Sequence, residues 1–345
     1  MKPPVARSVF PALRRRAVAL SLAAAALAAP AASAVTIDWV TVGSPSNAAD
    51  TFYVNCGPSN ASPCGAVATP YEIGKYEVTN AQYAEFLNSV AAADANGLYN
   101  TDMASDATFG GITRSGIPGS YSYAAKSGFE SKPVTYVSFW DAARFSNWLQ
   151  NGQPTGAQSV LTTEDGAYTL TPAAIAANSV LRNLTASVFL PSESEWYKAA
   201  YYDPIAELYY DYPTGTNTTI DCVAPGDDTG NSANCFPYAD PLGTLTDVGA
   251  YALSDSLSGT FDQGGNVFEW HEQIKFDTDR GLRGGAWTGD WSNLGAFASN
   301  YDSPTREIDN IGFRLASVPE PSAGSAGLLA LAGLGGLALR SHRRG

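Results

Sequence analysis

The chain has 345 residues, of which 45% are hydrophobic, and its formal net charge is −13. Its basic residues gather at the two ends, so residues 35–319 carry 12 Lys and Arg against 32 Asp and Glu, a net charge of −20. This balance disfavours nucleic acid and anionic membrane surfaces as partners, because both are bound through basic patches, and it suits cation binding outside the cell.

Residues 1–34 predict a secretory signal peptide. Basic residues as far as Arg16 precede an apolar run from Ala17 to Ala31, and Ala32-Ser33-Ala34 follows as a small-residue cleavage site. This order favours cleavage after Ala34 over a transmembrane anchor, for which the run is short and rich in alanine. We therefore expect an exported chain, with one domain over residues 35–317 because no clean linker interrupts it.

The four cysteines form two close pairs in loops rich in Gly, Pro, Ser and Asn. In an oxidising compartment this spacing predicts two local disulfides, Cys56 with Cys64 and Cys222 with Cys235. A zinc site of cysteines and histidines is the alternative, but the only histidines are His271 and His342, so we do not expect one.

Three helix starts are clear in the sequence. Thr79, Ser138 and Ser192 each begin a capping pattern, and the segments that follow place apolar residues on one helical face. Short strands are expected at residues 71–76, 134–137, 283–287 and 311–315, and a short apolar segment at 188–190 precedes the third helix. The aromatic residues of the helices are interpreted as core.

Two long polar segments, residues 96–132 and 203–262, separate these elements. Such loops are uncommon in a compact domain unless something holds them in place. Disulfides, bound ions and loop aromatics are the groups that could do so here.

Five motifs follow one another along the chain. They are YEIGKYEVTN at 71–80, KPV with VSFWDA at 132–142, LPSE with EW at 190–196, GNVFEW at 265–270, and RGGAW with IGFRLA at 283–316. In this order they resemble the formylglycine-generating enzyme, or sulfatase-modifying factor, family from about Ile37 to Ala316. The resemblance implies an α+β variant of the C-type lectin fold, loop-rich, with short strands, about three short helices and bound calcium.

A cation site is also indicated by residues 262–269, where two carboxylates flank a Gly-Gly turn with free carbonyls. The resemblance implies one calcium held by the side chains of Asp262 and Glu269 and the carbonyls of Gly265 and Val267. A carboxylate that merely caps the turn is the alternative. The resemblance implies a second calcium at Asn234, Asp240 and the carbonyls of Cys235 and Leu242.

The family's chemistry does not carry over to this sequence. Its enzymes oxidise a substrate cysteine with two copper(I)-binding cysteines, four and nine residues after the second glycine of a Gly-Gly-Ser motif. The matching positions here are Gly289 and Leu294, and Ala286 stands at the serine. Copper(I) requires soft thiolates, so neither copper nor formylglycine generation is expected.

Other chemistries are weakly supported. The related iron-dependent sulfoxide synthases use a histidine-rich site shared with an additional helical domain, and we expect neither here. A Ser-His-Asp triad would have to use His271, which we expect instead to pack near the cation site.

Two hypotheses remain. The first is a noncatalytic module that binds a sugar or protein through the loop between Trp287 and Asn310, with Trp287 itself in the core. The residues expected to contact the ligand are Asp290, Trp291, Asn293, Asn300, Tyr301 and Asp302. The second is an oxidoreductase or protein-maturation factor with a cysteine-independent mechanism.

Residues 318–345 form the last predicted unit. Val318-Pro319-Glu320-Pro321-Ser322 precedes 17 small and apolar residues, and an arginine-rich end follows. This resembles the PEP-CTERM sorting tail of Gram-negative bacteria, with a plain C-terminal anchor as the alternative. The resemblance implies transient anchoring in the inner membrane, cleavage by an exosortase, and delivery to the cell surface or extracellular matrix, where polysaccharide or an envelope protein would be the partner.

Overall fold

The computed structural model describes Met1, residues 34–236 and residues 243–319. The predicted signal peptide and nearly all of the predicted sorting tail therefore lie outside the described residues. Within the described part, no helix is both long and apolar enough to cross a membrane.

Two four-stranded sheets form the centre of the fold. The first has the order β1-β2-β14-β5 and is antiparallel throughout, with β1 Trp39–Val42, β2 Tyr71–Gly74, β14 Ala316–Ser317 and β5 Val188–Phe189. The second has the order β12-β11-β10-β13, with β12 Asn300–Asp302, β11 Asp279–Arg283, β10 Phe268–Lys275 and β13 Ile311–Gly312. Because β14 pairs with β2, the end of the last family motif lies beside the first motif.

The three predicted helices are confirmed. They are α1 Asn80–Val90, α3 Phe139–Gln150 and α5 Glu193–Tyr201, and Thr79, Ser138 and Ser192 cap them with both bonds of the capping box. The described residues contain two further α-helices, α2 Asp102–Ser105 and α4 Pro172–Ala176. These two helices are too short to show a helical period in the sequence, and for this reason the sequence predicts only about three helices.

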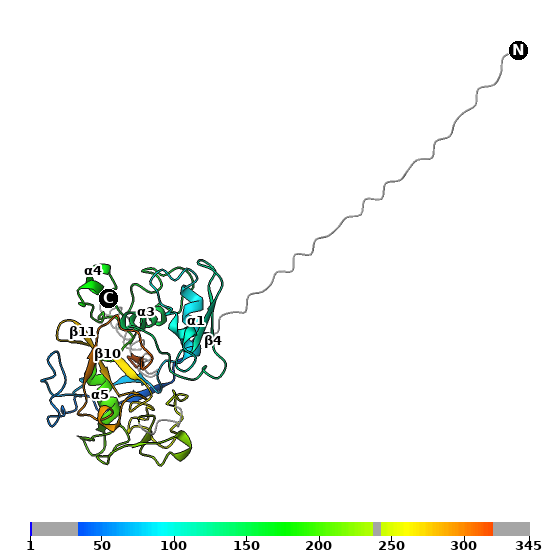
Figure 1. Cartoon of the computed structure of the whole chain (residues 1–345). Coiled ribbons are helices and arrows are strands. Elements are labelled where there is room, and N and C mark those ends of the chain that lie inside the picture. Colours follow the sequence, from blue (N-terminus) through cyan, green and yellow to red (C-terminus); the bar gives the residue numbers. More distant parts are fainter. Residues whose placement is uncertain (2–33, 237–242, 320–345) are drawn as a thin grey trace, which may run out of the picture. The chain divides into compact units, whose positions relative to one another are not determined.

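Shorter elements interrupt the long polar segments. β3 Ile112–Ser115 and β4 Ser122–Ala125 form a hairpin beside α1 (Figure 1), and β6 Tyr202–Asp203 pairs with β7 Leu208–Tyr209. β8 Asp221–Cys222 pairs in parallel with β9 Ser232–Ala233, and two 3-10 turns lie at η1 Pro225–Asp227 and η2 Trp291–Asn293.

Two strand predictions are wrong. Residues 134–137 form no strand, because Tyr136 has a φ of 59°, which breaks the extended backbone. The strand expected at 283–287 instead ends at Arg283, since Gly284 and Gly285 have φ values of 95° and 72°. Of the strand expected at 311–315, only Ile311–Gly312 forms a strand, β13, and β14 begins beyond its end at Ala316.

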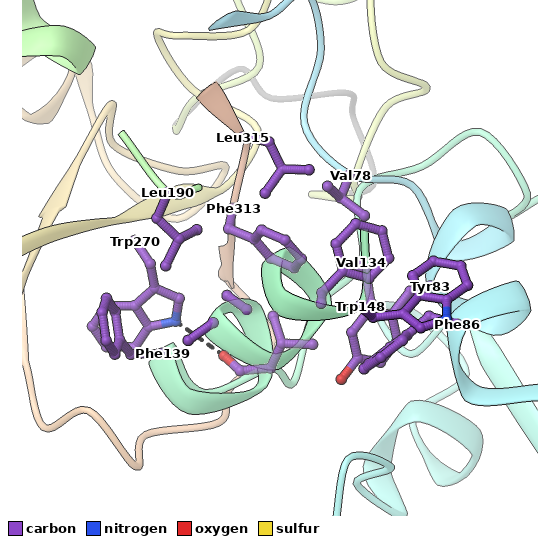
Figure 2. Packing of buried hydrophobic residues seen from close by; sticks show 14 of the residues in the cluster. Val78, Tyr83, Phe86, Val134, Phe139, Trp148, Leu190, Trp270, Phe313 and Leu315 are labelled. Atoms are coloured by element: carbon purple, nitrogen blue, oxygen red, sulfur yellow. Dashed lines mark hydrogen bonds between the residues drawn. The ribbon is translucent and has the colours of Figure 1, made fainter. Parts of the chain in front are cut away.

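The main core lies between α1, α3 and the sheets, and Figure 2 shows aromatic rings filling it. Phe145 of α3 contacts Phe86 of α1 at 5.3 Å and Phe313 at 5.5 Å between ring centroids. Trp270 of β10 packs on Phe139 and donates its indole N–H to the carbonyl oxygen of Val137 at 3.1 Å. The helix aromatics are therefore core, as expected.

Both predicted disulfides are confirmed, and each lies in a small apolar cluster of its own. The Cys56–Cys64 disulfide packs with Trp196, Tyr197 and Tyr201. The Cys222–Cys235 disulfide packs with Tyr212, Ile220 and Leu294. These clusters hold the polar segments against the body of the domain.

Candidate functional site

The positions that match the family's copper cysteines are occupied by ordinary packing. Leu294 is fully buried in the Cys222–Cys235 cluster. A Cβ on Gly285 would lie 2.6 Å from Leu294 Cδ1, so this side chain fills the space beside the glycine pair. Gly289 donates its N–H to the carbonyl of buried Ala286 at 2.9 Å.

These residues do not fit a copper(I) ion. Neither glycine nor leucine offers a thiolate, and all four cysteines are bonded to one another in disulfides.

Glu269, the predicted calcium ligand on β10, is held by an arginine. Its two carboxylate oxygens accept from Arg314 Nε at 2.6 Å and Nη2 at 2.7 Å, and Oε2 also accepts from Trp196 Nε1 at 2.7 Å. All three side chains are fully buried. A dication bound to Glu269 would have to share this carboxylate with a fixed guanidinium.

Asp262, the other predicted carboxylate ligand, lies near a second buried acid. Its Oδ2 accepts from the N–H of Gly249 at 2.6 Å, and burial raises its pKa to about 6. Burial also raises the pKa of Glu77 well above its ordinary value, and among the described residues Glu77 Oε2 has no hydrogen-bond partner. Glu77, Asp262 and Glu269 thus face one Arg314, an excess of acid that protons or a cation can balance.

The second predicted calcium set is partly described. Asn234 is buried, and its Nδ2 donates to the carbonyl of Thr244 at 3.0 Å and to Asn266 Oδ1 at 3.2 Å. Its Oδ1 has no hydrogen-bond partner among the described residues, which fits a cation or a water. Asp240 and Leu242 lie outside the described residues, and Cys235 is bonded to Cys222.

Asn266 connects the two predicted calcium sites. It donates to Glu77 Oε1, beside Asp262, at 3.3 Å, and it accepts from Asn234 of the second site. The neighbouring Gly265 approaches the Asn234 carbonyl closely, and Val267 is fully buried. In the described part of the chain, no three His, Cys, Asp or Glu side chains are grouped so that they could hold a metal ion. A cation here would depend on amide and carbonyl oxygens, and the calcium assignment stays a prediction.

The first half of the predicted ligand loop is a rigid turn. Asp290 caps η2 by accepting from the N–H of Ser292 at 3.0 Å, and the Ser292 hydroxyl and N–H lower the pKa of Asp290. Trp291 is 46% exposed, and a Cβ on Gly289 would touch Asn293. Leu294, one residue later, anchors this half to the disulfide cluster.

The second half of the loop is a sheet edge. Asn300, Tyr301 and Asp302 form β12, which pairs with β11. Tyr301 is 46% exposed, and its ring lies 4.9 Å from that of Phe276 in the β10–β11 turn. The first half of the loop is therefore attached to the Cys222–Cys235 cluster, and the second half is part of the sheet. Trp287, at the start of the loop, is half-buried, and its ring stacks on that of Phe109 with the centroids 4.1 Å apart.

Sequence reasoning missed a buried charge cluster around Glu193. Lys275 Nζ lies 2.8 Å and Arg283 Nη2 2.9 Å from Glu193 Oε1. Burial acts to raise the pKa of Glu193, but the neighbouring His271, Arg283 and Lys275 outweigh it and lower this pKa to about 2. Lys275 also donates to Asn60 at 2.7 Å, so the cluster ties the Cys56–Cys64 loop to β10 and β11. No local spacing signals these pairs, because Lys275 and Arg283 lie 82 and 90 residues from Glu193 along the chain.

Comparison with known families decides the assignment. Residues 40–318 match the formylglycine-generating-enzyme sulfatase family model, described as a sulfatase-modifying factor enzyme 1-like domain. The chain belongs to this family. A curated relative, hercynine oxygenase of Mycobacterium tuberculosis, is 24% identical over 292 residues, which cover 76% of this chain and 56% of the relative. The chain therefore spans little more than half the length of that relative.

Two solved structures of similar shape show the fold of this family member. The crystal structure of CarF matches with a TM-score of 0.50 and 21% identity, covering 83% of this chain and 99% of CarF. Treponema denticola variable protein 1 matches with a TM-score of 0.52 and 18% identity, covering 84% of this chain and 98% of that protein. The predicted α+β, loop-rich, C-type-lectin-like fold of the formylglycine-generating-enzyme type is thus confirmed.

Proposed function

We propose that this protein is a noncatalytic member of the sulfatase-modifying factor family that binds a sugar or protein ligand outside the cell. The observation that carries the proposal is the pair Gly289 and Leu294. Glycine and a buried leucine stand where the family's oxidation chemistry requires two thiolates. A fold without its reaction centre still offers a rigid surface for recognition.

The loop between Trp287 and Asn310 is the proposed binding surface. Trp291 and Tyr301 expose aromatic area, while Asp290, Asn293 and Asn300 add polar groups. Aromatic side chains lose little conformational entropy on binding, and short polar side chains adapt their hydrogen bonds to the ligand. This mixture suits sugars and protein surfaces.

The test is a screen of the purified protein on arrays of exopolysaccharides and envelope proteins. We expect binding that weakens at least tenfold when Trp291→Ala and Tyr301→Ala are combined. Ile205→Ala is the matched control, since Ile205 is 93% exposed elsewhere on the surface. Absence of binding, or equal binding by the double variant, would contradict the proposal.

Export and sorting belong to the same proposal. The sequence patterns at residues 1–34 and 318–345 support secretion, transient inner-membrane anchoring, and an exosortase as the sorting partner. Mass spectrometry of the protein recovered from its native surface should give a chain that begins at Val35 and ends near the Pro-Glu-Pro sequence. Intact termini would contradict this part.

A second candidate is an oxidoreductase or maturation factor with a cysteine-independent mechanism. The similarity to a protein named hercynine oxygenase favours it. Metal analysis of the purified protein discriminates the two functions, since stoichiometric iron or copper would support the second and calcium alone the first. Mass spectrometry of a cysteine-containing sulfatase peptide incubated with the protein tests formylglycine formation directly.

A further inference from the structure

A groove of about 340 Å³ is lined in part by residues 303–305, near the end of the loop between Trp287 and Asn310. Four separate segments line it: Trp140 at the start of α3, residues 175–178 at the end of α4, Asp277 and Thr278 in the β10–β11 turn, and residues 303–305. Its volume falls at the lower end of the roughly 300–1,000 Å³ found for ligand pockets. It has room for one or two sugar rings.

Trp140 marks the groove as more than a surface irregularity. Its side chain is only 4% exposed, and its indole N–H donates to no acceptor in the described part of the chain. A buried N–H without an acceptor is destabilising, so such groups in folded proteins call for an explanation. An oxygen of a bound molecule would supply the missing acceptor.

Hydrogen bonds within the protein hold the walls of the groove in place. Asn178 is buried, accepts from Arg280 Nε at 2.7 Å and donates to the Asp279 carbonyl at 3.2 Å. Beside the lining residue Asp277, Phe276 N donates to the Pro58 carbonyl at 2.9 Å, which holds the β10–β11 turn. A preformed site binds without the entropic cost of ordering its own side chains.

The lining favours an uncharged, hydroxyl-rich molecule. Asp277 is the one ionisable side chain among the lining residues, so an anion would be repelled. Thr278, Ser303 and Thr305 offer hydroxyls, and those of Ser303 and Thr305 lie 3.0 Å apart, bonded to each other. Ile175, which is partly exposed, supplies apolar area for the C–H face of a sugar ring, with the buried Trp140 and Pro304 beside it.

We propose that this groove binds a neutral hexose or N-acetylhexosamine unit, with Trp140, Asp277 and Thr305 as its contacts. The inference rests on the proposed function for the class of ligand, and it adds a second site to the loop. The Trp140 N–H is itself buried, so a sugar oxygen reaches it only with a small movement of the indole or of residues 303–305. Binding should therefore change the fluorescence of Trp140.

The test uses the full chain with glucose, galactose, mannose and N-acetylglucosamine as probes, in saturation-transfer NMR and tryptophan fluorescence. We expect saturation transfer to at least one sugar. Asp277→Asn and Thr305→Val should each lower its affinity at least tenfold, and Trp140→Phe should remove the fluorescence change. Asp277 and Thr305 are exposed, so their variants test the groove even where Trp140→Phe fails to fold.

The groove variants are made in the Trp291→Ala, Tyr301→Ala background, so that the loop contributes no signal. Ile205→Ala, at a residue that is 93% exposed elsewhere on the surface, is the matched control. No saturation transfer from any of the four sugars overturns the inference, as does transfer that survives Asp277→Asn and Thr305→Val. Array binding that depends on Trp291 and Tyr301 would in that case leave the proposed function standing. The two proposals therefore fail separately.

Discussion

At the scale of single residues, His271 shows how burial decides chemistry. The ring is fully buried on β10, Nδ1 accepts from the N–H of Gln273 at 3.3 Å, and Nε2 has no hydrogen-bond partner in the described residues. Burial lowers the pKa of His271 to about 3, so the ring is neutral at pH 7. A histidine held this way is poorly suited to carry a proton in catalysis.

His271 should make stability depend on pH. The unfolded chain binds a proton below the ordinary pKa of 6.5, whereas the folded chain resists it until about pH 3. The contribution of His271 to the free energy of unfolding is therefore fully present above pH 6.5. It decreases as the pH falls, by about 2 kcal/mol at pH 5. Urea unfolding at pH 7 and pH 5 should therefore show that acidification is less favourable to the native protein than to His271→Gln, by about this amount.

The comparison between the two proteins isolates His271. Asp262 and Asp141, with pKa values raised to about 6 from 3.8, and Glu307, with a pKa raised to about 7 from 4.5, act in the opposite direction over that range, but they do so equally in both proteins. Glu193, whose pKa is lowered to about 2 from 4.5, loses its contribution mainly below pH 5. An equal effect of acidification in the native protein and the variant would show that His271 does not titrate as described.

At the scale of elements, the β10–β11 hairpin depends on one glycine. His271 pairs with Gly281, and the register shifts before Ile274 pairs with Arg280. A Cβ on Gly281 would lie 1.9 Å from Cε1 of the His271 ring. The hairpin closes only because this position carries no side chain.

Gly281→Ala should therefore destabilise the protein by about 2 kcal/mol or more, through overpacking against the imidazole. Gly226→Ala is the control, since no atom lies within 4 Å of a Cβ built there. Thermal unfolding measures both variants. Combining Gly281→Ala with His271→Ala should cost less than the sum of the single changes, and strict additivity would exclude the contact as the cause.

At the scale of the whole molecule, some buried carboxylates have a cation of their own and others do not. Glu193 and Glu269 are paired with buried cations, whereas Glu77 and Asp262 share only the guanidinium of Arg314 with Glu269. Asn234 Oδ1, linked to this region through Asn266, has no partner among the described residues. We expect calcium to act on the stability of the whole domain from here.

Calcium should raise the thermal unfolding temperature, and chelation should lower it. A ligand at a hundredfold excess over its Kd stabilises the folded state by about 2.7 kcal/mol. Asn234→Ala should abolish the difference between calcium and chelator, whereas Asp277→Asn, on an exposed turn, should retain it. An identical unfolding temperature with calcium and with chelator would contradict the calcium prediction.

The sequence by itself determined the features that depend on residues close together in the chain, namely the helix starts and the local disulfides. The capping boxes at Thr79, Ser138 and Ser192 act over three residues, and the two disulfides close loops with sequence separations of 8 and 13, so spacing alone was enough to predict them. The ordered motifs predicted the fold, and Gly289 and Leu294 are the positions from which we expect the copper chemistry to be absent.

Only the tertiary structure decided which distant groups meet. Glu269 pairs with Arg314 45 residues away, Glu193 pairs with Arg283 90 residues away, and the Trp140 groove draws on four separate segments. Local periodicity carries no information on such pairs, because their free energy arises only once the whole fold has removed them from water. These contacts are strong because they are buried, and they cannot be predicted from local sequence because the fold alone brings their partners together.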